Sequence, residues 1–379
     1  MTKVVMLALP DISIANGQGV YSRKVLSTIA NNIHDKSELY LITPTPTKFD
    51  IEKIFPDEVK YKFLPRKKDR SILWHFYSQF IFLYYILKLK PDFVIFSAKP
   101  SLLSVVISSF FLDFKKIVLV EGLGHKSLKK LGGTVVNYLG GVIFKKLFYK
   151  ADSIYPAYKS AESWIKSYDN DAPTQVIPCG IDDTLFRPLE RQNKESGPKG
   201  DFILFGYVGS FRDVHRLDLL LDLVSSCDNY RLKLIGDGEK MAYVKESIID
   251  RGLESSVELV GTLPQDVIAQ ALVDCDIMWA YTDVKHWGVP IKAYEYLACN
   301  KPVIVSKRNE FDFIEEEGFG LCLSSECPPE ISNEVGKYLE RVGKNHSVES
   351  YSYIKNKYNW SNFSTISDRV NNGNESCNE

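Results

Sequence analysis

The chain has 379 residues, which is more than one ordinary hydrophobic core accommodates, so its length favours two domains. With 45% apolar, 25% charged and 12% aromatic residues, its composition excludes collagen-like, low-complexity and wholly disordered proteins. The formal net charge of −1 conceals two halves of opposite sign, because residues 1–190 contain 26 basic and 18 acidic residues whereas residues 191–379 contain 21 and 30.

The first predicted element is a strand over Lys3–Leu9. Its apolar run, Val4–Leu9, is only six residues long and follows a single basic residue, which makes a poor secretory signal peptide. The seven cysteines contain no C-x-x-C pair, as expected of reduced thiols rather than of disulfides or a zinc site. We therefore expect a cytoplasmic protein.

A glycine-containing loop, Asn16–Gly19, follows this strand, and a helix is predicted from about Val20. Glycines let a backbone approach a ligand closely, and a helix N-terminus offers N–H donors to an anion. The loop does not complete a G-x-G-x-x-G dinucleotide fingerprint, because Ser22 stands where the third glycine belongs.

Short β-branched runs then alternate with helical patterns through the first half. Because these runs do not alternate between apolar and polar residues, they indicate parallel strands covered on both faces of a doubly wound α/β sheet. The predicted strands after the first are Leu39–Thr43, Tyr61–Leu64, Phe93–Phe96, Ile117–Val120, Ser153–Tyr155 and Gln175–Ile177.

The most apolar stretch is Ile72–Leu87. Its 16 residues fall short of the roughly 20 that cross a bilayer, and it contains polar side chains such as His75 and Gln79. Its flanks are basic, so it is either a buried helix with solvated ends or an interfacial helix on a membrane surface. The same two interpretations apply to residues 129–150.

The positive charge of the first half is concentrated in residues 60–150, which hold 17 basic residues and four acidic ones. Such a region indicates an anionic partner, which could be a nucleic acid, an acidic phospholipid surface or a polyanionic substrate.

A polar segment rich in helix and strand breakers, Glu190–Asp201, predicts a linker, and the alternation of strands and helices resumes after it. We predict Rossmann-like domains over 1–190 and 191–345, C-terminal helices over 346–379 that pack back toward the first domain, and a disordered tail after about residue 370. The later predicted strands are Phe202–Val208, Leu232–Ile235, Val257–Leu259, Ile277–Ala280, Pro302–Val305 and Gly320–Leu323; the helices are 215–226, 239–251, 264–272, 290–298 and 328–342.

Four segments of the second half resemble, in order and spacing, retaining glycosyltransferases of the GT-B fold, family 4 (glycosyl transferases group 1). The resemblance is close over residues 165–310. It implies two facing Rossmann-like domains with an interdomain cleft, the first binding an acceptor and the second a nucleotide-sugar donor. The segments are Val176–Asp182 with Phe186–Pro188, Gly206–Leu221, Leu232–Glu239 and Gly288–Val303.

Transfer from a sugar nucleotide must stabilise a departing diphosphate, which cations and preorganised N–H donors do well. By the resemblance, Gly209 lies at the donor, and Arg212 and His215 could supply the cations. The family has an arginine and a lysine where this chain has Ser210 and His215, so which of Arg212 and His215 replaces that pair stays open.

A second anion-binding feature is predicted where Pro290 begins a helix. The amides of Ile291 and Lys292 would point at phosphate, and Lys292 adds a side-chain charge. By the resemblance, Glu295 projects from the first turn and accepts hydrogen bonds from the nucleotide ribose; the alternative is an acid favoured near a helix N-terminus.

This chain lacks the first glutamate of the family's E-x7-E pair, because Trp287 stands eight residues before Glu295. That glutamate normally contacts the transferred sugar. Trp287 and Gly288 are therefore expected to contact the donor in another way, and the identity of the sugar stays open.

In the first half, Glu121 and His125 follow a predicted strand. The resemblance places His125 near the transferred sugar or acceptor, as a hydrogen-bond donor or proton carrier, and Glu121 could bind an acceptor hydroxyl or act as a base. It also places Gly17 and Gly19 at the donor. The alternative is a Gly-rich turn with solvated polar residues.

These features predict a retaining glycosyltransferase that needs no cofactor and no metal, the nucleotide sugar being a substrate. The acceptor would be a saccharide or a polyprenyl-diphosphate-linked saccharide, as in bacterial-type surface polysaccharide or glycolipid assembly. The basic region 60–150 would face an anionic membrane surface, on the inner side of the cell membrane, and not nucleic acid. The alternatives are a sugar-nucleotide epimerase of similar fold and a non-enzymatic polyanion-binding protein.

Overall fold

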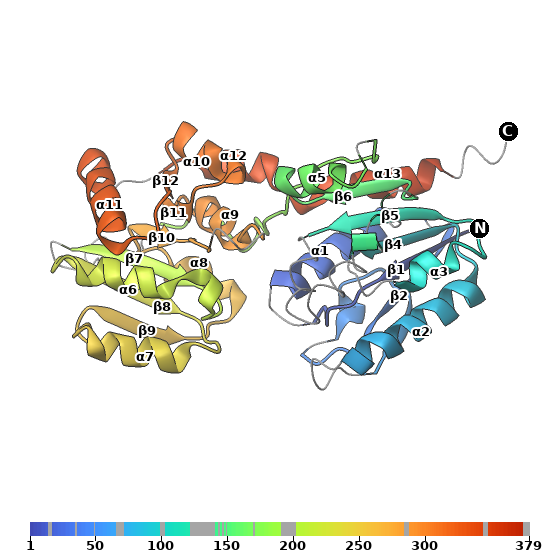
Figure 1. The fold of residues 1–379 in the computed structure, drawn as a ribbon, viewed down its shortest axis with the longest axis horizontal. Coiled ribbons are helices and arrows are strands. Elements are labelled where there is room, and N and C mark those ends of the chain that lie inside the picture. The colour runs from blue at the N-terminus through green and yellow to red at the C-terminus, as the bar shows by residue number, and fades with distance from the viewer. Residues whose placement is uncertain are drawn as a thin grey trace. The chain divides into compact units, whose positions relative to one another are not determined.

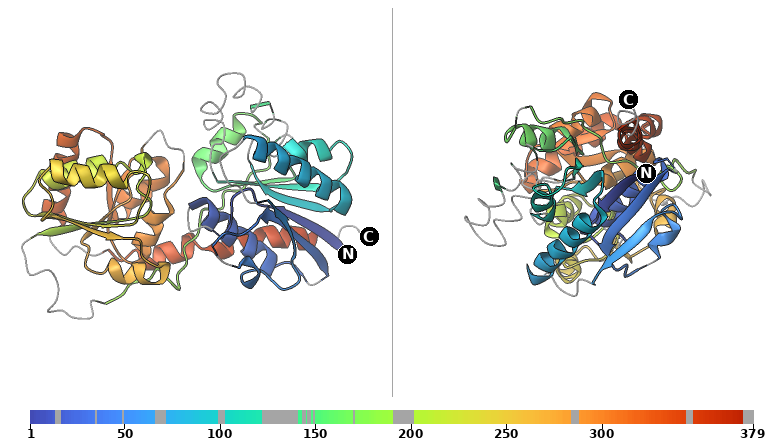
Figure 2. Two further views of the ribbon diagram at one scale, coloured as in Figure 1. Left: turned by 90° about the horizontal axis from the view of Figure 1, so that it is seen from below. Right: turned by 90° about the vertical axis from the view of Figure 1, so that its right-hand side faces the viewer.

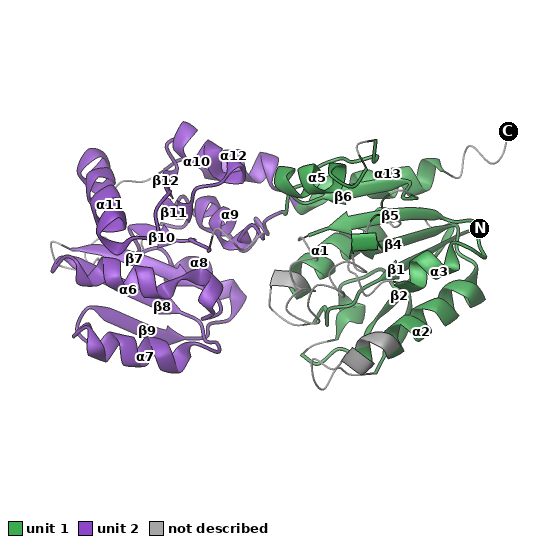
Figure 3. Ribbon diagram, viewed as in Figure 1, with its two compact units in different colours: residues 1–179, 360–379 green, residues 180–359 purple. Residues whose placement is uncertain are grey.

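The computed structural model places the chain in two compact units. The first comprises Met1–Cys179 and Trp360–Glu379, and the second comprises Gly180–Asn359 (Figure 3). The residues that the structure describes are 1–13, 17–34, 36–48, 50–65, 72–98, 103–121, 141, 142, 145, 148, 150–169, 171–190, 202–283, 288–343 and 348–373.

A six-stranded parallel sheet forms the centre of the first unit, with the strand order β3–β2–β1–β4–β5–β6 (Figure 1). All five residues of β4 are buried, as are the last four of β1 and of β5. Burial on both faces is why these strands are continuous apolar runs in the sequence. The strands are β1 Thr2–Leu7, β2 Ser37–Pro44, β3 Lys60–Leu64, β4 Phe93–Ser97, β5 Lys115–Val120 and β6 Ser153–Pro156.

Helices cover both faces of this sheet. In Figure 2, α2 and α3 lie on one face, and α1 lies on the other beside α13 from the end of the chain. The Ser367 hydroxyl of α13 donates to the Ile29 carbonyl of α1 at 2.9 Å. The helices are α1 Gly17–Asn31, α2 Ile72–Leu89, α3 Leu103–Ser108, α5 Lys159–Lys166 and α13 Ser364–Asn372, with 3₁₀ helices η1 Ile51–Lys53 and η4 Trp360–Phe363.

The second unit has its own six-stranded parallel sheet, in the order β12–β11–β10–β7–β8–β9. Two hydrophobic clusters pack against it, one including side chains of α6, α7 and α11 and the other those of α9, α10 and α12. Its strands are β7 Ile203–Val208, β8 Tyr230–Ile235, β9 Val257–Gly261, β10 Ile277–Trp279, β11 Val303–Ser306 and β12 Gly320–Leu323. Its helices are η2 Asp213–His215, α6 Leu217–Ser225, α7 Met241–Asp250, α8 Gln265–Ala271, α9 Ile291–Ala298, η3 Asn309–Phe311, α10 Asp312–Glu316, α11 Pro328–Val342 and α12 Tyr351–Lys357.

The chain changes unit at Cys179–Gly180, eleven residues before the predicted boundary at 190. The reason is that Ile181 and Phe186 are buried in the core of the second unit. Likewise α12, expected to pack with the first domain, contacts α9, and the Ser350 hydroxyl before it donates to Leu297 O at 2.6 Å.

Two further local predictions differ from the structure. Helix α1 begins at Gly17, so Gly17 and Gly19 lie in its first turn and not in a preceding loop. The predicted strand Gln175–Ile177 forms no strand, and its neighbour Thr174 makes only an isolated bridge with Ile154. No helix in the described part of the chain has the length and apolar character that crossing a membrane requires.

Candidate functional site

The candidate site is built where β7 and β8 end, at the edge of a parallel sheet where ligands usually bind. The turns after these strands pack backbone against backbone. The Gly209 N–H donates to Ile235 O at 2.9 Å, and a Cβ added to Gly236 would lie 1.9 Å from Gly209 O. Both glycines also have φ near +140°, so a side chain at either position would be strained.

Tyr207, in β7, organises the polar groups beside this turn. Its hydroxyl donates to Ser210 O at 2.7 Å and accepts from Lys292 Nζ at 3.0 Å. The Lys292 ammonium also lies 4.1 Å from the centre of the Tyr207 ring, a cation–π geometry. A Cβ on Gly209 would be 2.6 Å from the same Nζ, so the turn leaves room for the ammonium only because residue 209 is glycine.

Helix α9 begins at this place. Pro290 is its N-cap residue rather than its first helical residue, so Ile291 and Lys292 supply the first two amides, which have no acceptor within the helix. The Tyr296 hydroxyl accepts from Val208 N at 2.7 Å and donates to Val208 O at 3.0 Å, which fixes α9 to the end of β7. The predicted helix and its N-terminal amides are therefore next to Gly209.

Glu295 is the fifth residue of α9 and lies in the second turn, not in the first as predicted. It is half-buried, and none of the described residues donates a hydrogen bond to its carboxylate. Burial raises its pKa to about 7, opposed by the charge of Lys292. Burial likewise lowers the pKa of Lys292 to about 7, opposed by Glu295. Both groups therefore hold their charge at a cost in this environment.

The two predicted cations are placed differently. The centres of the His215 and Tyr207 rings are 5.9 Å apart, so His215 and Lys292 both lie beside Tyr207. Arg212 is exposed and lies 3.6 Å from Glu239, in a solvent-facing ion pair. The structure thus brings His215 together with Gly209, Ile291, Lys292 and Glu295, and leaves Arg212 at the rim.

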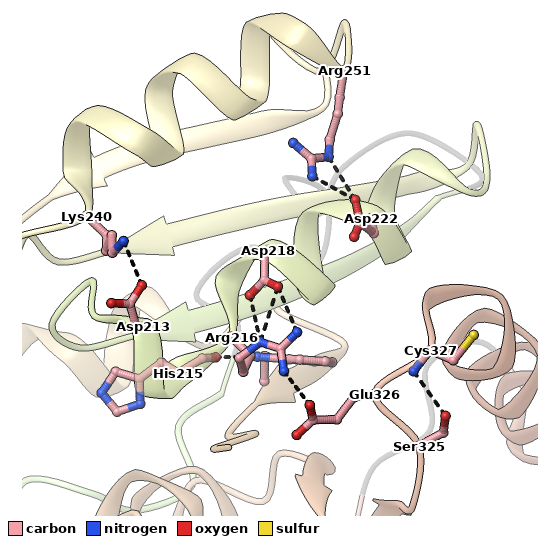
Figure 4. A network of polar contacts seen from close by, with 11 residues as sticks. Asp213, His215, Arg216, Asp218, Asp222, Lys240, Arg251, Ser325, Glu326 and Cys327 are labelled. Carbon is pink, nitrogen blue, oxygen red and sulfur yellow. Dashed lines mark hydrogen bonds and ion pairs between the residues drawn. The ribbon is translucent and has the colours of Figure 1, made fainter. Parts of the chain in front are cut away.

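Ion pairs support the loop that carries His215 (Figure 4). Arg216, which has φ +46°, lies 2.9 Å from Asp218 and 2.8 Å from Glu326, and these hydrogen bonds raise its pKa. Lys240 lies 2.7 Å from Asp213 at the start of η2. The Arg216 guanidinium is therefore engaged with two carboxylates, Asp218 and Glu326.

Sequence reasoning missed two residues of this region. Tyr207 could have been noticed because a tyrosine in a buried strand needs a partner for its hydroxyl. Arg308 follows β11 at the same sheet edge and donates to the Thr282 hydroxyl at 3.2 Å, the Ser306 hydroxyl at 2.9 Å and Gly288 O at 3.2 Å. It thereby ties Thr282 to Gly288.

The remaining predicted residues belong to the first unit or are not described. Glu121 follows β5, is half-buried, and accepts a hydrogen bond on its backbone carbonyl from the Tyr158 hydroxyl at 3.3 Å. Gly17 and Gly19 lie in the first turn of α1, as noted above. His125 and Trp287 lie outside the described residues.

Residues 189–355 match the family model of glycosyl transferases group 1, and no curated protein sequence matches the chain. Sucrose-phosphate synthase from Thermosynechococcus elongatus has a TM-score of 0.79 and 15% identity over 100% of both chains. Anabaena Alr3699/HepE in complex with UDP has a TM-score of 0.71 and 14% identity, covering 98% of this chain and 99% of that one. The apo form of the lipopolysaccharide outer core galactosyltransferase WaaB has a TM-score of 0.68 and 16% identity, with 97% and 99% covered.

These similarities confirm the predicted fold class, two parallel α/β sheets of the GT-B type. The matches extend over nearly all of both chains, so the likeness covers the folds of both units. Membership of family 4 and retention of configuration stay predictions. The comparisons show a GT-B fold for the chain and a similarity to glycosyl transferases group 1 over residues 189–355.

Proposed function

We propose that this protein is a retaining glycosyltransferase that moves a sugar from a nucleotide-sugar donor to a saccharide or lipid-linked acceptor. The family match over residues 189–355 and the GT-B neighbours support glycosyl transfer. The complex of Anabaena HepE with UDP supports a uridine nucleotide as the first donor to test.

One observation carries the assignment of the site. A half-buried carboxylate, Glu295, without a hydrogen-bond donor in the described structure, lies one turn along α9 from a desolvated ammonium, Lys292. A nucleoside diphosphate would supply what each group lacks, because its ribose hydroxyls donate to the carboxylate and its phosphates accept from the ammonium. The first amides of α9 and the His215 side chain would add further donors to phosphate.

In the proposed reaction the bond between the sugar C1 and the diphosphate oxygen breaks, and its electron pair stays with the diphosphate. The acceptor hydroxyl oxygen forms the new bond to C1 on the same face, and its proton passes to an oxygen of the departing diphosphate. Lys292 and the α9 amides stabilise the charge that develops on that diphosphate. The proposal assigns this work to protein groups and needs no metal.

The acceptor belongs to the first unit in this proposal, with Glu121 and His125 as the groups that bind and orient it. Residues 60–150 contain 17 basic and four acidic residues, and this positive charge supports an anionic acceptor such as a polyprenyl-diphosphate-linked saccharide at a membrane surface. WaaB, a galactosyltransferase of the lipopolysaccharide outer core, is a fold neighbour that supports a role in surface polysaccharide or glycolipid assembly.

Thermal unfolding with UDP and UDP-sugars tests the site directly. A ligand at 100 times its dissociation constant stabilises the folded state by about 2.7 kcal/mol. Glu295→Gln removes a charged acceptor worth about 1.5–3 kcal/mol, so UDP should bind at least tenfold more weakly. Glu334→Gln, at a half-buried glutamate on α11 of the same unit, is the matched control and should bind UDP like the unchanged protein.

Full stabilisation of the Glu295→Gln variant by UDP would contradict the assigned role of Glu295. The reaction class is tested by incubating a UDP-sugar with and without a saccharide acceptor and identifying the anomer of the product by NMR. Conversion of the donor sugar without any acceptor would overturn glycosyl transfer in favour of an epimerase.

A further inference from the structure

One face of the first unit presents a row of aromatic side chains to solvent. On α2, Tyr77, Phe80 and Tyr84 are exposed, with spacings of three and four residues that place them on one stripe. Ser78, Phe82 and Ile86 on the opposite stripe are buried. Helix α2 is therefore apolar on its outward side as well as on the side that packs against the sheet.

The segment after α3 adds two more rings. Phe110 is 64% exposed and Phe111 is 72% exposed. The Gln79 Oε1 of α2 accepts from Ser104 N at 3.2 Å and from Ser104 Oγ at 3.0 Å, which fixes α3 against α2. Both helices lie on the same face of the sheet (Figure 2).

This concentration of exposed rings is specific to that face. Among the described residues seven Phe or Tyr side chains are exposed, and five of them lie on α2 or directly after α3. The other two, Phe63 and Tyr243, are single residues on different elements. Scattered exposed apolar residues are ordinary, whereas a cluster indicates an interaction surface.

Lysines accompany these rings. Lys88 continues the α2 stripe, with its Nζ 3.2 Å from the Tyr84 hydroxyl and 5.4 Å from the centre of the Tyr84 ring. Lys150 Nζ lies 5.4 Å from the centre of the Phe110 ring, and Lys90 is exposed at the end of α2. Asp113, also exposed, is the acidic residue nearest in sequence to the Phe110–Phe111 pair.

We propose that this α2–α3 face, formed by Tyr77, Phe80, Tyr84, Lys88, Phe110 and Phe111, lies on the surface of an anionic lipid bilayer. Aromatic rings prefer the headgroup region, and lysines beside them bind lipid phosphates. The inference rests on the proposed function, in which the acceptor is lipid-linked, and it identifies the surface that meets the membrane.

Charge complementarity favours a bilayer over a second copy of the chain as the occupant. The charged residues described at this face are Lys88, Lys90 and Lys150 with a single acidic residue, Asp113, so two copies would bring like charges together. Each lysine close to an anionic bilayer raises the affinity of the protein for that bilayer about fivefold. The aromatic rings then add the apolar contact that a purely electrostatic attachment lacks.

Vesicle sedimentation of the full chain tests this surface. We expect binding to phosphatidylcholine vesicles that contain phosphatidylglycerol, and weak binding to phosphatidylcholine alone, both at low ionic strength. The double variant Phe80→Ser/Phe111→Ser should bind the anionic vesicles at least tenfold more weakly. Lys88→Gln/Lys150→Gln should lose most of the preference for anionic lipid.

The second unit offers a matched control on α7. Tyr243 is 44% exposed with Lys240 Nζ 5.5 Å from its ring centre, and Ile249 is 64% exposed. Tyr243→Ser/Ile249→Ser should bind vesicles like the unchanged chain. An equal loss in both double variants, or no binding by the unchanged chain, would overturn the proposal.

Two further measurements separate the possible outcomes. All of these variants should keep the thermal stabilisation by UDP, so a failure of membrane binding is distinguishable from a failure of the proposed donor site. Sedimentation velocity without lipid should show the unchanged chain and Phe80→Ser/Phe111→Ser in the same oligomeric state. A dimer that this variant dissociates would assign the face to a second copy and overturn the membrane assignment.

Discussion

The Lys292 ammonium is held by one hydroxyl and one aromatic ring in a place where burial disfavours its charge. The Tyr207 ring offsets part of the lost hydration through its 4.1 Å cation–π contact. Glu295, three residues along the helix, is disfavoured as an anion for the same reason. The two residues are thus ready to gain from a ligand that donates to one and accepts from the other.

Donor binding should depend on pH with a maximum near pH 7. The pKa of Glu295 is raised to about 7, so at lower pH it is protonated and accepts from ribose only as a weaker, neutral acceptor. The pKa of Lys292 is lowered to about 7, so at higher pH it is neutral and binds phosphate weakly. Calorimetry with UDP-glucose between pH 5.5 and 9 should show affinity falling on both sides, by up to about tenfold per pH unit for one linked proton.

Variants assign the two limbs of that profile. Lys292→Met should remove the alkaline limb, and Glu295→Gln should remove the acidic one. Because the diphosphate of a nucleotide sugar is a diester, its own titration does not contribute in this range. A profile that stays flat in the unchanged protein would contradict the proposed roles of both groups.

At this scale the sequence predicted the residues that a motif carries and missed those that only packing defines. Lys292 and Glu295 follow a proline in a recognisable segment, and the structure places Lys292 beside Gly209 with Glu295 three residues further along α9. Tyr207 looks like any strand residue in the sequence, since its hydroxyl partners come from residues 3 and 85 positions away. Arg212 pairs with Glu239 in solvent, and its charge also acts on the Tyr207 hydroxyl, so its predicted contact with the donor stays a prediction.

Among the elements, the paired turns after β7 and β8 depend most on glycine. Gly236→Ala should destabilise the protein by about 3 kcal/mol or more, because its Cβ would overlap the Gly209 carbonyl at a strained φ. Urea unfolding measures this change. Gly336→Ala, in the middle of α11 with no atom within 4 Å of the added Cβ, should instead stabilise by about 0.5–1 kcal/mol. Similar effects of the two substitutions would show that the turns tolerate a side chain.

The strands were predictable because burial on both faces leaves an apolar run that local sequence reveals. Every strand that the structure assigns coincides with a predicted one to within three residues at each end. One predicted strand, Gln175–Ile177, is not a strand in the structure. It runs beside β6, and Ile177 N donates to Pro156 O at 3.0 Å. Proline has no N–H to return, so a regular ladder cannot continue there.

At the scale of the whole molecule, residues 360–373 complete the first unit. Trp360 and Phe363 of η4 pack edge-on against Tyr21 of α1, with ring centres 6.1 and 6.0 Å apart. The sequence predicted C-terminal helices that return to the first domain, but it could not show where the return begins. That position depends on α12 packing against α9, a contact between residues far apart in the chain.

Trp360→Ala should destabilise the first unit by about 3 kcal/mol or more, as expected when a buried tryptophan is removed from a core. Hydrogen exchange followed by mass spectrometry should show faster exchange in α1 and β1, with β7 and β8 unchanged. Unchanged exchange in α1, or equal acceleration in both units, would contradict the packing described for η4.

The chain leaves the first unit at Cys179 and re-enters it at Trp360, which fixes an order of events during synthesis. A ribosome that has translated the first half has not yet made the residues that close the nascent core around α1. The second unit can reach its native state before η4 and α13, which complete the core of the first unit, have been synthesised. Translation that stops anywhere before Trp360 therefore damages the part of the molecule that was made first.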